Sequence, residues 1–212
     1  AAAAKLTAAA NTTSLSVLQP LLGQVLARLG ACEVLMESHE SGENHLEQAL
    51  RYVTTDWERA FMLAYLGFSA KGHGELSVGQ TLLHESLALS QQCQDPGLTA
   101  QVLYFLHRFV FGYAGAMRGF EESLALWRQV GRSDRIVEVL NFVAWYTWCL
   151  GDYAKASAYW QENLELCTTL GMQDALAWAL DSLGLTAWCQ GDLATAQSYL
   201  QQAAELYHAI SR

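Results

Sequence analysis

The sequence predicts an all-α fold built from five antiparallel helix pairs. Two observations predict it: apolar residues recur with the period of amphipathic helices, and the whole pattern repeats along the chain. One position of the repeat is occupied in turn by Leu50, Leu87, Leu124, Leu164 and Ala204, at steps of 37, 37, 40 and 40 residues. No segment alternates apolar and polar residues at strand length, so we expect no β-sheet.

Each repeat unit is expected to supply two helices. The first helices are placed at about 14–37, 56–72, 96–111, 133–149 and 173–189, and their partners at about 42–53, 76–92, 115–130, 153–169 and 193–209. Residues 1–12 are rich in alanine and are interpreted as a tail or a cloning remnant. Residues 13–212 show no linker, so we expect a single stack of helix pairs.

Capping residues support these helix boundaries. Thr55 with Glu58, and Ser77 with Gln80, have the spacing of a capping box ahead of an apolar run. Glycine is favoured just beyond a helix end, because it adopts the left-handed conformation without strain. The glycines that stand at expected helix ends are Gly131, Gly151, Gly171 and Gly191.

Composition excludes several classes of function. With 52% hydrophobic residues, the 212-residue chain is not disordered and can bury a substantial core. The 12 Lys and Arg residues against 21 Asp and Glu residues give a net charge of −9, so we expect no nucleic-acid partner. No apolar run is long enough to span a membrane, and no membrane partner is expected. The 5 cysteines lack paired spacing, which indicates reduced thiols and a cytoplasmic protein.

The repeats resemble the tetratricopeptide repeat family. That family has a Leu-Gly pair in the first helix, a turn similar to Gly151-Asp152-Tyr153, and small residues in the second helix. The Leu-Gly pairs here are Leu29-Gly30, Leu66-Gly67 and Leu183-Gly184, and the small positions are Ala116, Ala156 and Ala196, then Ala49, Ser86, Ser123 and Ala203. The resemblance covers residues 20–212 and implies a right-handed superhelical solenoid.

The repeat length suggests a narrower resemblance. Steps of 37 and 40 residues exceed the family period of about 34. Such long units look like the sensor regions of bacterial signal-transducing (STAND) NTPases and of large ATP-binding transcriptional activators. This resemblance implies a sensor domain of a larger bacterial signalling protein.

The free faces of the first helices form the candidate binding groove, because first helices line the concave surface in the family that these repeats resemble. Aromatic side chains with sparse polar groups are typical of ligand pockets and binding hot spots. The groove residues are Phe61, Tyr65, Phe68, Gln101, Phe105, Arg108, Phe109, Asn141, Trp145, Trp148, Trp178, Asp181 and Trp188. The alternative is that such rings pack in the core. We favour that alternative for the second-helix aromatics Phe120, Trp127, Trp160 and Tyr199.

The sequence predicts a non-catalytic binding module without cofactor or metal. It contains no GxxxxGK[ST] loop, Cys-x-x-Cys, His-Glu-x-x-His or Gly-x-Ser-x-Gly motif. The expected partner is a protein or peptide segment held in the groove. Two alternatives stay open: a small-molecule sensor domain of a transcriptional activator, and a plain oligomerisation scaffold. The family's carboxylate clamp is not expected, because Ala27, Ala31, Ala64 and Phe105 occupy the corresponding faces.

The last helix predicts a further contact. Leu206, Tyr207 and Ile210 make it apolar where a terminal repeat normally has a polar outer face. We therefore expect either a fragment of a longer receptor or self-association through this terminal helix.

Overall fold

The computed structural model describes the backbone of residues 2–108 and 113–211 and the side chains of residues 18–108 and 115–211. Over the described backbone it contains ten α-helices and no β-strand, as the sequence predicts. The chain divides into two compact units, Ala1–Leu106 and His107–Arg212. Among the described residues, no helix is long and apolar enough to cross a membrane.

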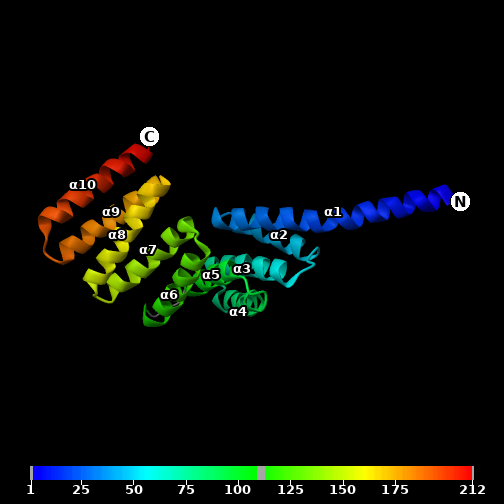
Figure 1. Ribbon diagram of the computed structural model, residues 1–212, viewed down its shortest axis with the longest axis horizontal. Coiled ribbons are helices and arrows are strands. Elements are labelled where there is room, and N and C mark those ends of the chain that lie inside the picture. The colour runs from blue at the N-terminus through cyan, green and yellow to red at the C-terminus, as the bar shows by residue number, and fades with distance from the viewer. Residues whose placement is uncertain (1, 109–112, 212) are drawn as a thin grey trace. The chain divides into compact units, whose positions relative to one another are not determined.

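The first unit contains two helix pairs followed by a fifth helix (Figure 1). Its elements are α1 (Ala2–Leu35), α2 (His39–Leu50), α3 (Asp56–Gly72), α4 (Leu76–Gln92) and α5 (Pro96–His107), whose last residue lies at the division between the units. Helix α1 packs on α2 and α3 packs on α4, while α2 and α3 join the two pairs. The first helices α1 and α3 also touch each other.

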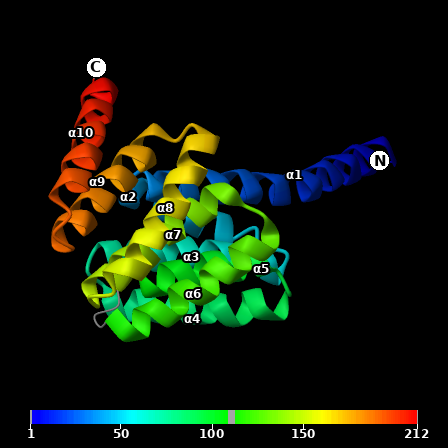
Figure 2. The same ribbon diagram turned by 60° about the vertical axis from the view of Figure 1, so that its left-hand side comes forward.

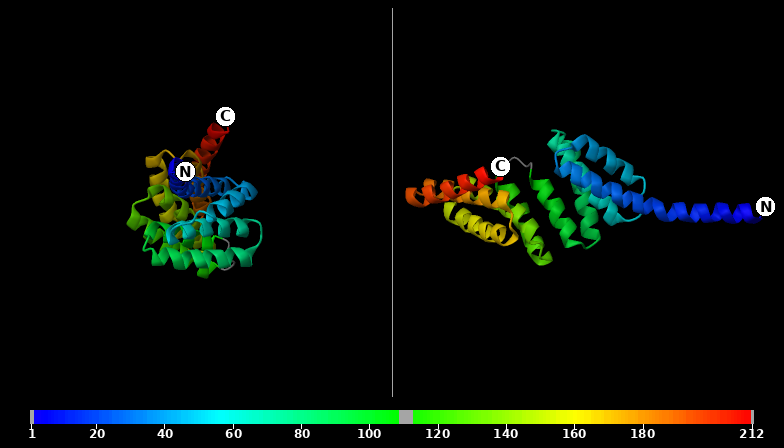
Figure 3. Two further views of the ribbon diagram at one scale, coloured as in Figure 1. Left: turned by 90° about the vertical axis from the view of Figure 1, so that its right-hand side faces the viewer. Right: turned by 90° about the horizontal axis from the view of Figure 1, so that it is seen from above.

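Helix α1 differs from the expectation at its start. It begins at Ala2 and includes the alanine-rich segment, since alanine is the strongest helix former. Figure 3 shows this amino-terminal part of α1 extending past α2 and α3. The partner helix α2 begins at His39, three residues before the expected Gly42. Gly42 therefore lies inside a helix, despite its low helix propensity, because it packs closely on α1.

The helix caps follow the sequence in most places. Thr55 accepts a hydrogen bond from the Glu58 amide, and the Glu58 side chain reaches back to the Thr55 amide, so this capping box is confirmed. The capping box expected at Ser77 is wrong. Gly74 turns the chain with a φ of 88°, and α4 already begins at Leu76, which places Ser77 in its first turn.

The second unit repeats the same two-helix pattern. Its elements are α6 (Tyr113–Val130), α7 (Ser133–Cys149), α8 (Tyr153–Leu170), α9 (Gln173–Cys189) and α10 (Leu193–Ile210). Helices α7 and α8 form one pair and α9 and α10 the next, with α8 against α9 and α7 in contact with α9. Figure 2 shows α9 and α10 side by side in a second view. The expected third pair, α5 with α6, falls on the two sides of the division, and its connection at 109–112 lies outside the described residues.

The turns of this unit use the glycines that the sequence singles out. Gly131, Gly151, Gly171 and Gly191 all have positive φ, between 69° and 85°. Asp152 and Asp192 then begin α8 and α10 by accepting hydrogen bonds from the amides of Lys155 and Thr195. Asparagine and aspartate are preferred caps because their side chains satisfy free amides of the first turn.

The core of the second unit forms where α8 packs against its neighbours. Ala144, Ala156, Trp160 and Leu183 make one buried cluster, and Trp148, Trp178 and Tyr199 pack on it from the side. The second-helix aromatics expected in the core are buried at Phe120, Trp127 and Trp160 and half-buried at Tyr199.

Candidate binding surfaces of the first helices

Aromatic residues of α3 and α5 form a connected ladder of rings in the first unit. Trp57 stacks on Phe61 with centroids 5.6 Å apart, and Phe61 contacts Tyr65 at 4.8 Å. Phe105 contacts Tyr65 at 5.2 Å and Phe68 at 4.3 Å. The exposed fraction falls along the ladder, from 42% at Trp57 to 5% at Tyr65 and 0% at Phe105. Tyr65, Phe68 and Phe105 therefore pack in the interior, and the ladder reaches solvent at its Trp57 and Phe61 end.

A cleft of about 240 Å³ opens at that end, between α1 and α3. Its lining residues are Gln24, Ala27, Arg28, Thr55, Trp57, Glu58, Phe61 and Met62. The indole of Trp57 is fixed in place, because its Nε1 donates a 2.7 Å hydrogen bond to Asp95 Oδ2. The Trp57 ring thus forms one fixed wall of the cleft. The cationic side chain of Arg28 lies across from it on α1.

Glu58 lies in the same cleft, but its carboxylate is already engaged. It accepts hydrogen bonds from the Thr54 amide and hydroxyl, the Thr55 amide and the Gln24 side chain. The bond from the Thr54 amide is the largest cause that lowers the pKa of Glu58 to about 2. Glu58 is consequently ionised at neutral pH and serves the capping box rather than proton transfer.

Three further groove residues lie near the division of the chain. Gln101 is 6% exposed, and its Nε2 has no hydrogen-bond partner among the described residues. Arg108 is exposed, with its guanidinium 5.4 Å from the centroid of the Phe142 ring. Phe109 lies outside the described residues.

The second unit has its own aromatic surface on α7 and α9. Trp145 and Trp148 stack with centroids 5.4 Å apart and an interplanar angle of 19°. Trp145 is 42% exposed, whereas Trp148 is half-buried and its Nε1 has no hydrogen-bond partner among the described residues. A narrow cleft follows these rings, lined by Trp145, Trp148, Trp160, Ser182 and Leu185.

The remaining α9 residues of the candidate groove differ in exposure. Trp178 is half-buried and meets the Trp160 ring edge-on at 5.4 Å, so it belongs partly to the core. Asp181 is half-buried, and Trp188 is 62% exposed, the largest exposed fraction of any tryptophan that the structure describes. Trp145 and Trp188 are therefore the two exposed tryptophans that the structure describes in this unit.

Asn141 serves the interior. It is 8% exposed, and its Oδ1 accepts a hydrogen bond from the side-chain amide of Asn163 on α8. Asn163 Oδ1 in turn accepts from the Cys167 thiol at 3.4 Å. The polar group that the sequence assigned to the groove thus satisfies a buried network, as buried polar groups generally must.

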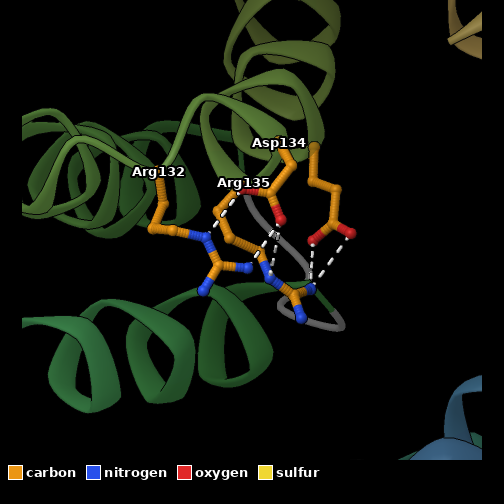
Figure 4. Close-up of polar contacts among 4 residues, drawn as sticks. Arg132, Asp134 and Arg135 are labelled. Atoms are coloured by element: carbon orange, nitrogen blue, oxygen red, sulfur yellow. Dashed lines mark hydrogen bonds and ion pairs between the residues drawn. The ribbon is translucent and has the colours of Figure 1, made fainter. Parts of the chain in front are cut away.

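Four charged side chains at the beginning of α7 pair with one another (Figure 4). Arg132 donates two hydrogen bonds to Asp134, at 2.8 and 2.7 Å, and Arg135 donates to both oxygens of Glu138, at 3.1 and 2.9 Å. The Arg132 hydrogen bond is the main cause that lowers the pKa of Asp134. Glu138 is therefore paired within its own helix.

Of the residues that line the first cleft, sequence reasoning assigned only Phe61 to the groove. Trp57 precedes Phe61 by four residues and so shares its helix face, a spacing that could have identified it. Arg28 lies on the first helix, whose free face looked featureless in sequence. In the second unit, Trp160 reaches the cleft although it comes from a second helix and is only 1% exposed.

Comparison with known proteins agrees with this architecture. The tetratricopeptide repeat model matches residues 135–209. No curated protein sequence matches the chain significantly. Solved structures share the fold at low sequence identity, so they establish the fold alone.

Three of these structures illustrate the likeness. A signal transduction ATPase with numerous domains (STAND) with a tetratricopeptide repeat sensor, PH0952 from Pyrococcus horikoshii, superposes with a TM-score of 0.80 at 17% identity, covering 89% of this chain and 30% of that one. A Rap protein complexed with competence and sporulation factor has a TM-score of 0.73 at 17% identity, covering 88% and 54%. BtubC from P. vanneervenii has a TM-score of 0.76 at 14% identity, covering 92% and 83%.

These findings place the chain among the helical-repeat proteins. The tetratricopeptide repeat model matches residues 135–209, and the wider chain has a TPR-like fold. That fold is generally a non-catalytic module for protein interaction, and no enzyme family is indicated.

Proposed function

We propose that this chain is a sensor or scaffold module that captures a protein segment on the aromatic faces of its first helices. The observation that carries the proposal is the position of the clefts. In each unit one cleft lies between first helices of neighbouring pairs, α1 with α3 and α7 with α9, and aromatic rings line part of it, although the second cleft is narrow at about 10 Å³. Exposed, fixed aromatic side chains are the typical anchors of a binding hot spot.

The size of the first cleft favours a protein segment over a small molecule. Its volume of about 240 Å³ lies below the roughly 300–1,000 Å³ of small-molecule sites. Such a space suits one large side chain of a bound segment. Two of the structural neighbours are consistent with this role, one having a tetratricopeptide repeat sensor and the other being complexed with competence and sporulation factor.

Selection from a random peptide library tests the proposal. Peptides enriched on the wild-type chain are labelled, and their affinity is measured by fluorescence polarisation for Trp145→Ala, Trp188→Ala and Trp57→Ala. Loss of a hot-spot aromatic should weaken at least one class of peptide by about 30-fold. Leu193→Ala is the matched control, because Leu193 is 64% exposed on the second helix α10.

The possible results separate the alternatives. If all three tryptophan variants bind like the wild-type chain, the first-helix faces are not the binding surface. If no peptide is enriched but one compound of a metabolite panel raises the melting temperature, the small-molecule sensor is favoured instead.

A further inference from the structure

Helix α1 has a second apolar face that nothing in the first unit covers. One face packs inward, where Ala27, Ala31 and Val34 are at most 5% exposed. The opposite face carries eight exposed apolar residues, which we call the α1 stripe: Leu18, Leu21, Leu22, Val25, Leu29, Cys32, Leu35 and Met36. The exposed fractions of its leucine, valine and methionine residues run from 43% at Leu35 to 78% at Met36. A helix that is apolar on both sides needs cover on both sides.

The spacing of the stripe specifies what kind of element covers it. Leu18, Leu22, Val25, Leu29, Cys32 and Met36 follow one another at alternating steps of four and three residues. This is the heptad pattern by which one helix packs into the holes of another helix along a shared seam. Pro20 lies off the seam, in a hollow beside Tyr52 of the first unit.

The charges beside the stripe fit a second copy of the same helix. Arg28 lies on one side of the seam, directly before Leu29, and Glu33 lies on the other side, directly after Cys32, where its carboxylate also contacts Ser41 and His45 of α2. In a parallel two-stranded coiled coil, the residue before one core position faces the residue five positions later on the partner, where opposite charges select the pairing. Two copies of α1 in parallel would therefore each place Arg28 beside Glu33 of the other. The stripe is self-complementary in this arrangement.

The area of the stripe is sufficient for such a pair. Eight half-exposed apolar side chains offer an area on the order of several hundred Å², which approaches the roughly 800 Å² per partner of a standard interface. A continuous apolar patch of this size is rarely left open on a monomer.

We propose that the chain forms a parallel homodimer through the α1 stripe. The two helices pair around a two-fold axis, with Leu22, Val25 and Leu29 in the seam and Arg28 paired with Glu33 across it. Cys32 occupies a seam position and therefore faces Cys32 of the second copy. This dimer is distinct from the self-association through the last helix that the sequence suggested.

Sedimentation velocity over a wide range of concentration gives the first test. The wild-type chain of 23.4 kDa should sediment at twice its own mass. Leu22→Glu with Leu29→Glu should give a monomer with an unchanged circular dichroism spectrum, because both side chains are exposed. Tyr207→Glu on α10 is the matched control and should leave the dimer intact. A monomeric wild-type chain, or a dimer that only Tyr207→Glu disperses, would overturn the proposal.

Oxidation tests the parallel register. Treatment with diamide should link two wild-type chains through Cys32, and Cys32→Ser should abolish the linked species. Arg28→Glu should weaken the dimer several-fold, because it places a negative charge beside Glu33 of the second copy. A dimer that never links at Cys32 contradicts the parallel register, and the proposal fails with it.

Discussion

Gly30 of α1 and Gly42 of α2 face each other where the two helices cross. A Cβ atom on Gly30 would lie 2.7 Å from the Gly42 carbonyl oxygen, and one on Gly42 would lie 2.8 Å from the Gly30 carbonyl oxygen. Gly67 and Gly79 repeat this arrangement between α3 and α4, at 3.0 and 2.7 Å. The first two helix pairs therefore approach more closely than any other residue would permit.

Substitution of these glycines should destabilise the fold. Gly30→Ala places a methyl group against the backbone of Gly42, which cannot move aside as a flexible side chain can. We expect a loss of about 1–3 kcal/mol in the free energy of unfolding. Urea denaturation measures it. Gly115→Ala is the control: nothing lies within 4 Å of its Cβ position in α6, so it should be neutral or stabilising. Equal effects of the two variants would contradict the close approach.

The Thr55–Glu58 capping box should make stability depend on acid. Glu58 keeps its charge in the folded state because its pKa is about 2, against an ordinary value of 4.5. Its contribution to stability is therefore complete above about pH 4.5 and is lost as the pH falls towards 2. Glu58→Gln should cost about 1 kcal/mol at pH 7 by chemical denaturation and much less at pH 3. Glu47→Gln, exposed in α2, removes the same charge without a cap and should show no such difference.

Lys71 should make stability depend on alkaline pH. Its Nζ donates a 2.7 Å hydrogen bond to the carbonyl oxygen of Leu106 near the end of α5, and burial lowers its pKa from 10.5 to about 8. Between those values the unfolded chain binds a proton that the folded chain has released, so stability rises with pH. The gain is on the order of 2 kcal/mol. Denaturation at pH 7.5 and pH 10 should show this gain in the wild-type chain and not in Lys71→Met. Parallel pH profiles of the two proteins would refute it.

The cysteines should react with alkylating reagents in a defined order. Cys32 is exposed, whereas Cys167 is buried, and burial raises the pKa of the Cys167 thiol to about 11. Because the thiolate is the reactive form, iodoacetamide should modify Cys32 first and Cys167 last in the Leu22→Glu, Leu29→Glu monomer, where no dimer seam covers Cys32. Mass spectrometry of timed digests gives the order, and denaturant should remove the difference. Early modification of native Cys167 would mean that the α8 core opens readily.

The fold could be predicted from sequence because the signals that define it are local and repeated. The helical period, the glycines of the turns and the caps at Thr55, Asp152 and Asp192 act within a few residues of each other, so neighbouring sequence is enough to show them. The failure at Ser77 has a local cause as well, since the turn at Gly74 ends earlier than the pattern indicates.

The exposure of the candidate groove residues could not be predicted from sequence spacing, because it depends on contacts with residues far away in the chain. Tyr65 and Trp145 occupy similar stripes on first helices, yet Tyr65 is 5% exposed and Trp145 is 42% exposed. The difference arises because Phe105 of α5 packs on the Tyr65 ring. Asn141 likewise became a core residue through Asn163, 22 positions away.

The sequence by itself determined the helices, their pairing within each unit and the repeat, because the hydrophobic period and the turn residues involve only neighbouring positions. Only the tertiary structure decided which faces stay open, because burial depends on what packs against a face from elsewhere in the chain. That is why Arg28 and the α1 stripe emerge as open surface, while Phe105 does not.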